Sequence, residues 1–265
     1  MKKLMILGVL GLLTFGLLVG CGETDTAEVE SVEQPFAGKT LMVYSGAGLR
    51  KPMDEIAEAF KAQYGAQVNY NYAGSAQLLS QIELTQEGDV YIPGDLMDIE
   101  NAQEKGFVGE FAEIVLHIPV IGVPKGNPAG IQSLADLANP GVEVILGDPK
   151  ANAIGRKAEK ILEKNNLLEQ VKANVVVEDA TVNEMVAHLA MGQGDASLIW
   201  EDNISGVEDI EIIPIPEEDN MIEIVPIGVL TMTKDAELAQ AFMDFVISDE
   251  GIAIFIKHGF KPIEE

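Results

Sequence analysis

The feature that most constrains this chain is a regular alternation of strand and helix patterns that begins at Thr40. Short apolar runs are followed by segments whose apolar residues recur at helical spacing. In the first such helix Met53 and Phe60 share a face, and Gly65 marks the helix end. Because parallel strands need helical crossovers, this order predicts an α/β fold in which mainly parallel sheets are flanked by helices.

A second series of the same kind starts near Ile118, so we expect two similar lobes rather than one continuous sheet. The first lobe is expected to comprise residues 37–118 and 226–265, and the second residues 119–225. Two long apolar segments, 118–123 and 222–232, are expected to cross between the lobes as hinge strands. The C-terminal helices then pack back on the first lobe.

The N-terminus predicts export and a lipid anchor. Lys2 and Lys3 precede an uncharged run, residues 4–19, which is shorter than the ~20 residues of a membrane-spanning helix and suits a signal peptide. The run ends in Leu-Val-Gly-Cys, which resembles the lipobox of bacterial lipoproteins and implies removal of residues 1–20 and lipidation of Cys21. A true anchor helix and an ordinary buried cysteine are the alternatives. As the single cysteine, Cys21 excludes internal disulfides and thiolate metal sites.

Residues 21–36 are expected to form a solvated acidic tether. Residues 22–35 contain five carboxylates, no basic residue and no aromatic residue, so they cannot bury enough apolar surface to offset the entropy of ordering. The whole chain carries 43 acidic and 17 basic residues, and loss of Lys2 and Lys3 leaves a formal charge of about −28. This balance argues against binding to nucleic acid or to anionic lipid. It does not exclude binding of a small ligand, because the nearest dipoles affect a buried site more than screened surface charge does.

Four turns lead from strand ends into helix starts, and each is a candidate anion site. Their sequences are SGAGL (45–49), GSAQ (74–77), NAIG (152–155) and DATV (179–182). Amides at a helix N-terminus and the helix dipole favour an anion, and such turns face one crevice in open α/β sheets. Ser75 and Thr181 stand where helix N-caps belong. Taken alone, the first turn is equally well explained as a tight turn that needs small residues, since it lacks the third glycine of a dinucleotide fingerprint.

The sequence offers little support for an enzyme, so we expect neither catalysis nor a cofactor. The chain has no G-x-S-x-G elbow and no H-E-x-x-H pair. Its three histidines, His117, His188 and His258, are far apart and are expected to have structural or solvated roles. The acidic pair Glu201 and Asp202 follows a strand and could ligate a cation, or cap the strand end and face water.

From about Lys39 to Phe260 the chain resembles the substrate-binding proteins of bacterial ABC importers, specifically the molybdate/tungstate-binding group. The resemblance rests on these segments: SGAGLRKPMDEIAEAFKAQYG, YAGSAQLLSQIE, GDVYIPGD, VPKGNP, LADLANPGVEVILGDP and AFMDFVISDEGIAIFIKHGF. It implies a two-lobed type II periplasmic-binding-protein fold and a monomer held by its lipid on the extracytoplasmic face of the cell membrane. The implied function is capture of a tetrahedral oxyanion, molybdate or tungstate, and its delivery to an ABC permease.

The same resemblance implies how the oxyanion is held: by hydroxyls and helix N-terminal amides from both lobes, without counter-charges. Ser75 matches a ligand-binding serine, and Ile154 and Ala180 match backbone donors. Gly48 stands where the family has another serine, and Trp200 where it usually has tyrosine. The expected ligand-binding residues are Ala47, Gly48, Gly74, Ser75, Ile154, Ala180, Thr181, Trp200 and Glu201. The alternatives are a cation or small organic anion bound through Glu201 and Asp202, or an enzyme on the same fold.

Overall fold

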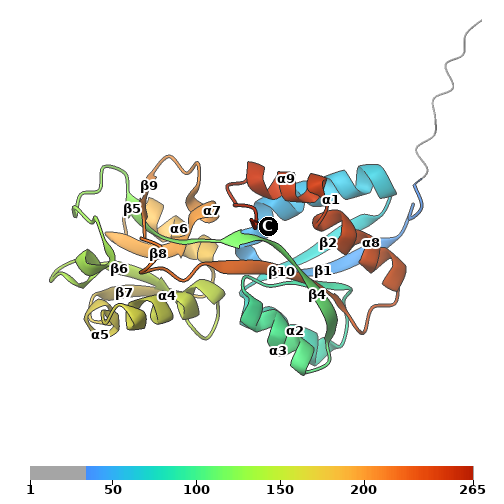
Figure 1. Cartoon of the computed structure of the whole chain (residues 1–265), viewed down its shortest axis with the longest axis horizontal. Coiled ribbons are helices and arrows are strands. Elements are labelled where there is room, and N and C mark those ends of the chain that lie inside the picture. Colours follow the sequence, from blue (N-terminus) through green and yellow to red (C-terminus); the bar gives the residue numbers. More distant parts are fainter. Residues whose placement is uncertain (1–33, 265) are drawn as a thin grey trace, which may run out of the picture. The chain divides into compact units, whose positions relative to one another are not determined.

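A computed structural model of the chain describes residues 34–264, which contain two five-stranded sheets flanked by helices (Figure 1). The predicted signal peptide, Cys21 and most of the predicted tether lie outside these residues. Among the helices of residues 34–264, none has the length and apolar character that crossing a membrane would need.

The first sheet has the strand order β2-β1-β3-β10-β4. Its strands are β1 (Thr40–Gly46), β2 (Gln67–Ala73), β3 (Val90–Ile92), β4 (Val108–His117) and β10 (Glu223–Leu230). Its helices are η1 (Ala47–Leu49), α1 (Arg50–Tyr64), α2 (Ser75–Thr85), α3 (Leu96–Glu104), α8 (Ala236–Val246) and α9 (Asp249–Lys257). Strand β1 is parallel to β2 and β3, whereas β10 is antiparallel to β3 and β4.

The first helix and the two C-terminal helices share one apolar core. Met53 and Phe60 of α1 are fully buried, and the ring of Phe60 meets that of Phe242 of α8 edge-on at 5.1 Å. Phe255 of α9 belongs to the same cluster. Gly65 ends α1 in the left-handed conformation with φ of +80°, which glycine adopts without steric cost. The first helix is therefore amphipathic, as predicted, and α8 and α9 share its core.

The second sheet has the strand order β7-β6-β8-β5-β9. Its strands are β5 (Pro119–Pro124), β6 (Val144–Gly147), β7 (Val175–Asp179), β8 (Ala196–Trp200) and β9 (Ile210–Pro214). Its helices are η2 (Leu134–Ala138), α4 (Ala153–Lys164), α5 (Leu168–Lys172), α6 (Val182–Ala190) and α7 (Glu201–Ile204). Two apolar clusters belong to this sheet and its helices, so the second lobe has a core of its own.

The chain crosses between the two sheets at Ile118, because β4 ends at His117 and β5 begins at Pro119. It returns between Pro214 and β10, which lies beside β4 although about 100 residues separate them in sequence (Figure 1). Residues 223–225, which the sequence assigned to the second lobe, pair with β4 of the first sheet. The register shifts at Pro226, which has no N–H to donate, but the pairing continues beyond it.

Strands β4 and β9 were not predicted from the sequence. Each lies at the edge of its sheet, β4 next to β10 and β9 next to β5. Each also carries exposed glutamates that interrupt the apolar pattern, such as Glu110 in β4 and Glu211 in β9. Edge strands commonly carry charge on their open side, so the apolar periodicity that marks a central strand is weak in them.

Candidate functional site

The four predicted helix starts meet at one cavity of about 30 Å³ between the two lobes. It is lined by residues 46–49, 73–75, 152–154 and 181–182, together with Gly94, His117 and Trp200. The first two segments belong to the first lobe, and the next two to the second. The structure therefore brings together four turns that are far apart in sequence.

Most of the residues predicted for the site line this cavity: Ala47, Gly48, Gly74, Ser75, Ile154, Thr181 and Trp200. Ala180 is not among the lining residues, although its carbonyl oxygen lies beside Gly74. Glu201 also lies outside the lining, because its carboxylate pairs with Lys261 Nζ at 3.0 Å. Within residues 34–264, no cluster of three or more His, Cys, Asp or Glu side chains could hold a metal ion.

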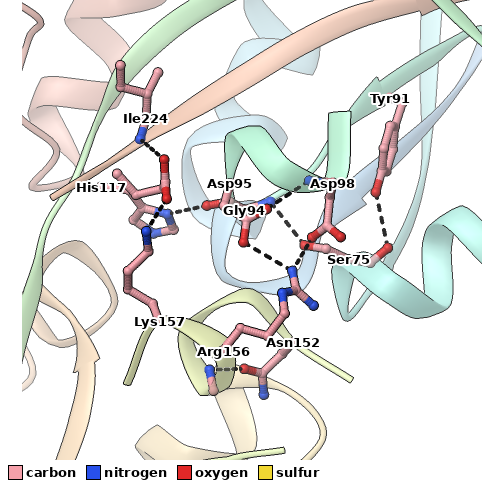
Figure 2. A network of polar contacts seen from close by, with 12 residues as sticks. Ser75, Tyr91, Gly94, Asp95, Asp98, His117, Asn152, Arg156, Lys157 and Ile224 are labelled. Atoms are coloured by element: carbon pink, nitrogen blue, oxygen red, sulfur yellow. Dashed lines mark hydrogen bonds and ion pairs between the residues drawn. The ribbon is translucent and has the colours of Figure 1, made fainter. Parts of the chain in front are cut away.

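Ser75 is the first residue of α2, and Gly74, not Ser75, is the N-cap. The Ser75 side chain is 3% exposed, and its Oγ accepts a hydrogen bond from the Gly94 N–H at 3.0 Å (Figure 2). Tyr91 anchors the same residue by donating its phenolic hydrogen to the Ser75 carbonyl at 3.1 Å. Since a hydroxyl can accept and donate at once, the Ser75 O–H remains available to donate to a ligand.

Asn152 is the N-cap of α4 and connects the start of this helix to β7. As N-cap it accepts a hydrogen bond from the Gly155 N–H at Oδ1, and its Nδ2 donates to the Asp179 carbonyl at the end of β7. The first amides of a helix have no acceptor inside that helix. Because the Asn152 side chain accepts the hydrogen bond of the Gly155 N–H, the N–H groups of Ala153 and Ile154, which line the cavity, remain available to a ligand.

Thr181 is the N-cap of α6, as predicted. Its N–H and its hydroxyl both donate to the Glu184 carboxylate, at 2.9 and 3.0 Å, in a capping box. Thr181 therefore lines the cavity with its donors already used. The next amide in α6, that of Val182, takes its place as the candidate ligand donor.

Glycine is required at two positions where the lobes touch. A Cβ on Gly48 would lie 2.8 Å from Asn203 Oδ1 and 2.8 Å from Val182 Cγ1, both from the second lobe. A Cβ on Gly74 would collide with the Ala151 carbonyl oxygen. The volume that a serine at position 48 would need is therefore filled by the opposite lobe.

His117 and Trp200 form an aromatic wall of the cavity. Their rings stack at 3.7 Å with an interplanar angle of 16°. His117 is 2% exposed, and its Nδ1 lies 2.9 Å from the Gly94 carbonyl, which can only accept, so Nδ1 carries a proton. Its Nε2 lies 3.3 Å from Asp202 Oδ1 but makes no hydrogen bond among the described residues. His117 is thus held in place as expected of a structural residue, and it also lines the cavity, which the sequence did not predict.

Arg156 of α4 reaches α3 of the first lobe, where it pairs with Asp95 at 3.1 Å and with Asp98 (Figure 2). Burial, reinforced by the neighbouring Asp95 carboxylate, raises the pKa of Asp98 to about 7, against the opposing effect of Arg156. The two carboxylates raise the pKa of Arg156, so its guanidinium stays charged. The next residue of α4, Lys157, pairs with Glu223 of β10 in the first sheet. None of these pairs was predicted from the sequence.

Comparisons with known proteins agree with this architecture. The sequence profile of the family described as bacterial extracellular solute-binding protein matches residues 41–261. A Haemophilus influenzae protein described as a binding protein is 33% identical over 223 residues, covering 84% of this chain and 91% of its own length. The molybdate-binding protein ModA of Mycobacterium tuberculosis H37Rv is 29% identical over 250 residues, covering 92% and 93%.

Solved structures share the fold at low identity. The periplasmic molybdate-binding protein of Azotobacter vinelandii has a TM-score of 0.73 at 18% identity, covering 84% of this chain and all of its own. The sulfate-binding protein SubI of Mycobacterium tuberculosis H37Rv has a TM-score of 0.77 at 18% identity, with 85% and 88% covered. A periplasmic thiamin-binding protein reaches 0.75 at 16% identity, with 85% and 84% covered. The predicted two-lobed type II periplasmic-binding-protein fold is confirmed.

Proposed function

The chain belongs to the bacterial extracellular solute-binding proteins, and from that premise we propose that it captures a small tetrahedral oxyanion, molybdate or tungstate, for an ABC permease. The observation that carries the proposal is the composition of the cavity wall. Four helix starts converge on it, and its lining contains no Lys, Arg, Asp or Glu residue. Such a wall offers N–H and O–H donors to an anion and no carboxylate to repel it.

The size of the cavity supports an inorganic ion over an organic ligand. One water needs roughly 10–15 Å³, and pockets for drug-sized molecules span about 300–1,000 Å³. A cavity of about 30 Å³ suits a compact ion and is too small for a ligand of the size of thiamin.

The helix termini supply the positive potential that the acidic surface lacks. Each helix N-terminus carries about half a positive charge, so four together can compensate a dianion without any basic side chain. Hydrogen bonds to charged groups contribute roughly 1.5 to 3 kcal/mol each. Five or six would cover the ~10 kcal/mol of submicromolar affinity after the costs of association.

Between oxyanions, the sequence relatives favour molybdate or tungstate. The molybdate-binding relative is 29% identical over 92% of this chain, whereas a sulfate-binding relative from Synechocystis is 24% identical over 97% of it, so the preference rests on the higher identity. Molybdate and tungstate have nearly the same size and charge, so one site serves both.

The cation alternative has less support. The Glu201 carboxylate pairs with Lys261, and Asp202 is 5% exposed and lies against His117. Neither acidic residue lines the cavity that the helix starts surround.

The remaining parts of the proposal concern delivery. Residues 1–20 act as a lipoprotein signal peptide, Cys21 carries the lipid, and residues 21–36 tether the folded part, which works as a monomer. The two crossings between the sheets act as the hinge on which the lobes open to release the anion.

Elemental mass spectrometry of protein purified under native conditions tests the proposal, with cells grown in medium supplemented with molybdate or tungstate. We expect molybdenum or tungsten to copurify at close to one atom per chain. Copurification of a divalent cation without either element would contradict the oxyanion proposal.

A further inference from the structure

Two asparagines of the second lobe reach across to the SGAGL turn of the first. Asn183 of α6 donates from Nδ2 to the Ala47 carbonyl at 2.9 Å. Asn203 of α7 donates from Nδ2 to the Gly48 carbonyl, also at 2.9 Å. Neither asparagine lines the ligand cavity, so the binding role proposed above does not account for these contacts.

The two hydrogen bonds fix the direction of two amides. A trans peptide group is planar, and its carbonyl oxygen and the following N–H point in opposite directions. Holding the Ala47 carbonyl therefore orients the N–H of Gly48, and holding the Gly48 carbonyl orients that of Leu49. Gly48 and Leu49 line the ligand cavity, whereas both asparagines line a separate cavity of about 170 Å³ that borders Gly48. The asparagines thus hold the turn from the side opposite to the ligand.

Accepting these hydrogen bonds also makes the two peptide groups better donors. Hydrogen bonds in a chain polarise one another. When the carbonyl oxygen of a peptide group accepts a hydrogen bond, the N–H of the same peptide group becomes a stronger donor. An anion at the cavity and an asparagine behind the turn would therefore strengthen each other's contact with the same peptide group.

Asn203 is itself held in one orientation. Its Nδ2 donates both to the Gly48 carbonyl and to Asp202 Oδ2, at 2.9 and 2.6 Å. Its Oδ1 is buried without a hydrogen-bond partner among the described residues, and it lies 2.8 Å from where a Cβ on Gly48 would stand. Asn203 and a side chain at position 48 are therefore mutually exclusive in this arrangement of the lobes.

We propose that Asn183 and Asn203 are positioning residues for the anion: they orient the amides of Gly48 and Leu49 and tie anion capture to closure of the lobes. The inference rests on the oxyanion function proposed above. Both contacts bridge the lobes, so they form only when the lobes are closed. An anion that binds the oriented amides then stabilises the closed form, and closure raises the affinity for the anion by the same factor.

The test compares Asn183→Ala and Asn203→Ala with wild-type protein by calorimetric titration with sodium molybdate and sodium tungstate. We expect each substitution to raise the Kd about three- to tenfold, the effect of one lost hydrogen bond. Asn174→Ala is the matched control, because Asn174 Nδ2 also donates to two backbone carbonyls, those of Leu137 and Asn139, but within the second lobe. We expect this control to leave the Kd unchanged even where it lowers the midpoint of thermal unfolding.

A second readout tests the steric part. Gly48→Ala is expected to raise the Kd more than tenfold in the wild-type background. The factor should be at least threefold smaller in a background that combines Asn203→Ala with Val182→Ala, because both side chains that a Cβ at position 48 would meet are then shortened. Equal factors in the two backgrounds, or wild-type Kd values for both asparagine variants, would overturn this inference while the oxyanion function stands. A wild-type protein that binds neither anion would overturn both.

Discussion

Arg156 forms an ion pair with Asp98 across the two lobes, and Asp95 shares the same guanidinium. Arg156 lies near the start of α4, and Asp95 is the N-cap of α3, one residue after the cavity-lining Gly94. The ion pair therefore joins the lobes directly beside the proposed anion site. Both carboxylates are nearly buried, so this closed arrangement depends on the guanidinium that compensates them.

Replacing Arg156 by alanine should weaken anion binding by more than tenfold. Removing one partner of a buried pair leaves an uncompensated charge that costs about 3 kcal/mol, but opening the lobes returns the carboxylates to water. The loss should therefore appear in the Kd more than in the free energy of unfolding, and calorimetry with chemical denaturation separates the two. Lys172→Ala, which removes an exposed pair with Glu159 inside the second lobe, is the matched control and should change neither. A Kd for the Arg156 variant within twofold of wild type would contradict this role.

Asp98 should make the stability of the protein depend on pH between about 4 and 7. Its pKa is raised from 3.8 to about 7, so the folded protein holds this proton more tightly than the unfolded chain does. The stability that it contributes is full below the unfolded pKa and is lost as the pH rises through about 7. Asp98→Asn should remove this component, which denaturant titrations of both proteins at pH 5 and pH 8 would measure. If the difference in unfolding free energy between variant and wild type is the same at both pH values, the raised pKa is wrong.

Ser75 should contribute more to affinity than any other single hydroxyl. Ser75→Ala removes the acceptor of the Gly94 N–H and the donor to the anion, and we expect binding to weaken by about 1 to 3 kcal/mol. Ser80→Ala in the same helix is the control, because the Ser80 hydroxyl donates to the Ala76 carbonyl on the exposed side. Calorimetry measures the anion affinity of both variants. If Ser75→Ala binds the anion as tightly as Ser80→Ala, Ser75 does not bind the ligand.

Cys21→Ala should release the protein from membranes. The apolar run before it is too short to span a bilayer and ends in a lipobox-like tetrapeptide, so the lipid is the expected anchor. Fractionation of cells that express wild type or variant would show the wild type with membranes and the variant in the soluble fraction. Retention of the variant with membranes would favour an uncleaved anchor helix instead.

The fold was predictable because local patterns in this chain agree with its final structure. The helical stripe of Met53 and Phe60 faces a core, and the small residues of the four turns mark the strand ends that meet at the cavity. Turn chemistry also placed Thr181 correctly as a cap. Such signals lie within ten or so neighbouring residues, so a single sequence displays them.

The contacts between the lobes were not predictable in the same way. Arg156 pairs with carboxylates about 60 residues away, and Asn203 reaches a carbonyl 155 residues away. No local pattern encodes such distances. The place of His117 in the cavity wall was not predictable for a related reason. Its stacking on Trp200 depends on the antiparallel pairing of β5 with β8, which places Trp200 beside the crossing.

The central claim is that the cavity between the lobes binds a tetrahedral dianion through helix amides and Ser75. The most direct test is calorimetric titration of the anion-free wild-type protein with molybdate, tungstate, sulfate and phosphate. We predict submicromolar Kd values for molybdate and tungstate, weaker binding of sulfate, and loss of affinity in Ser75→Ala. Binding of none of the four below millimolar concentration, with a cation bound instead, would contradict the account and direct attention to Glu201 and Asp202.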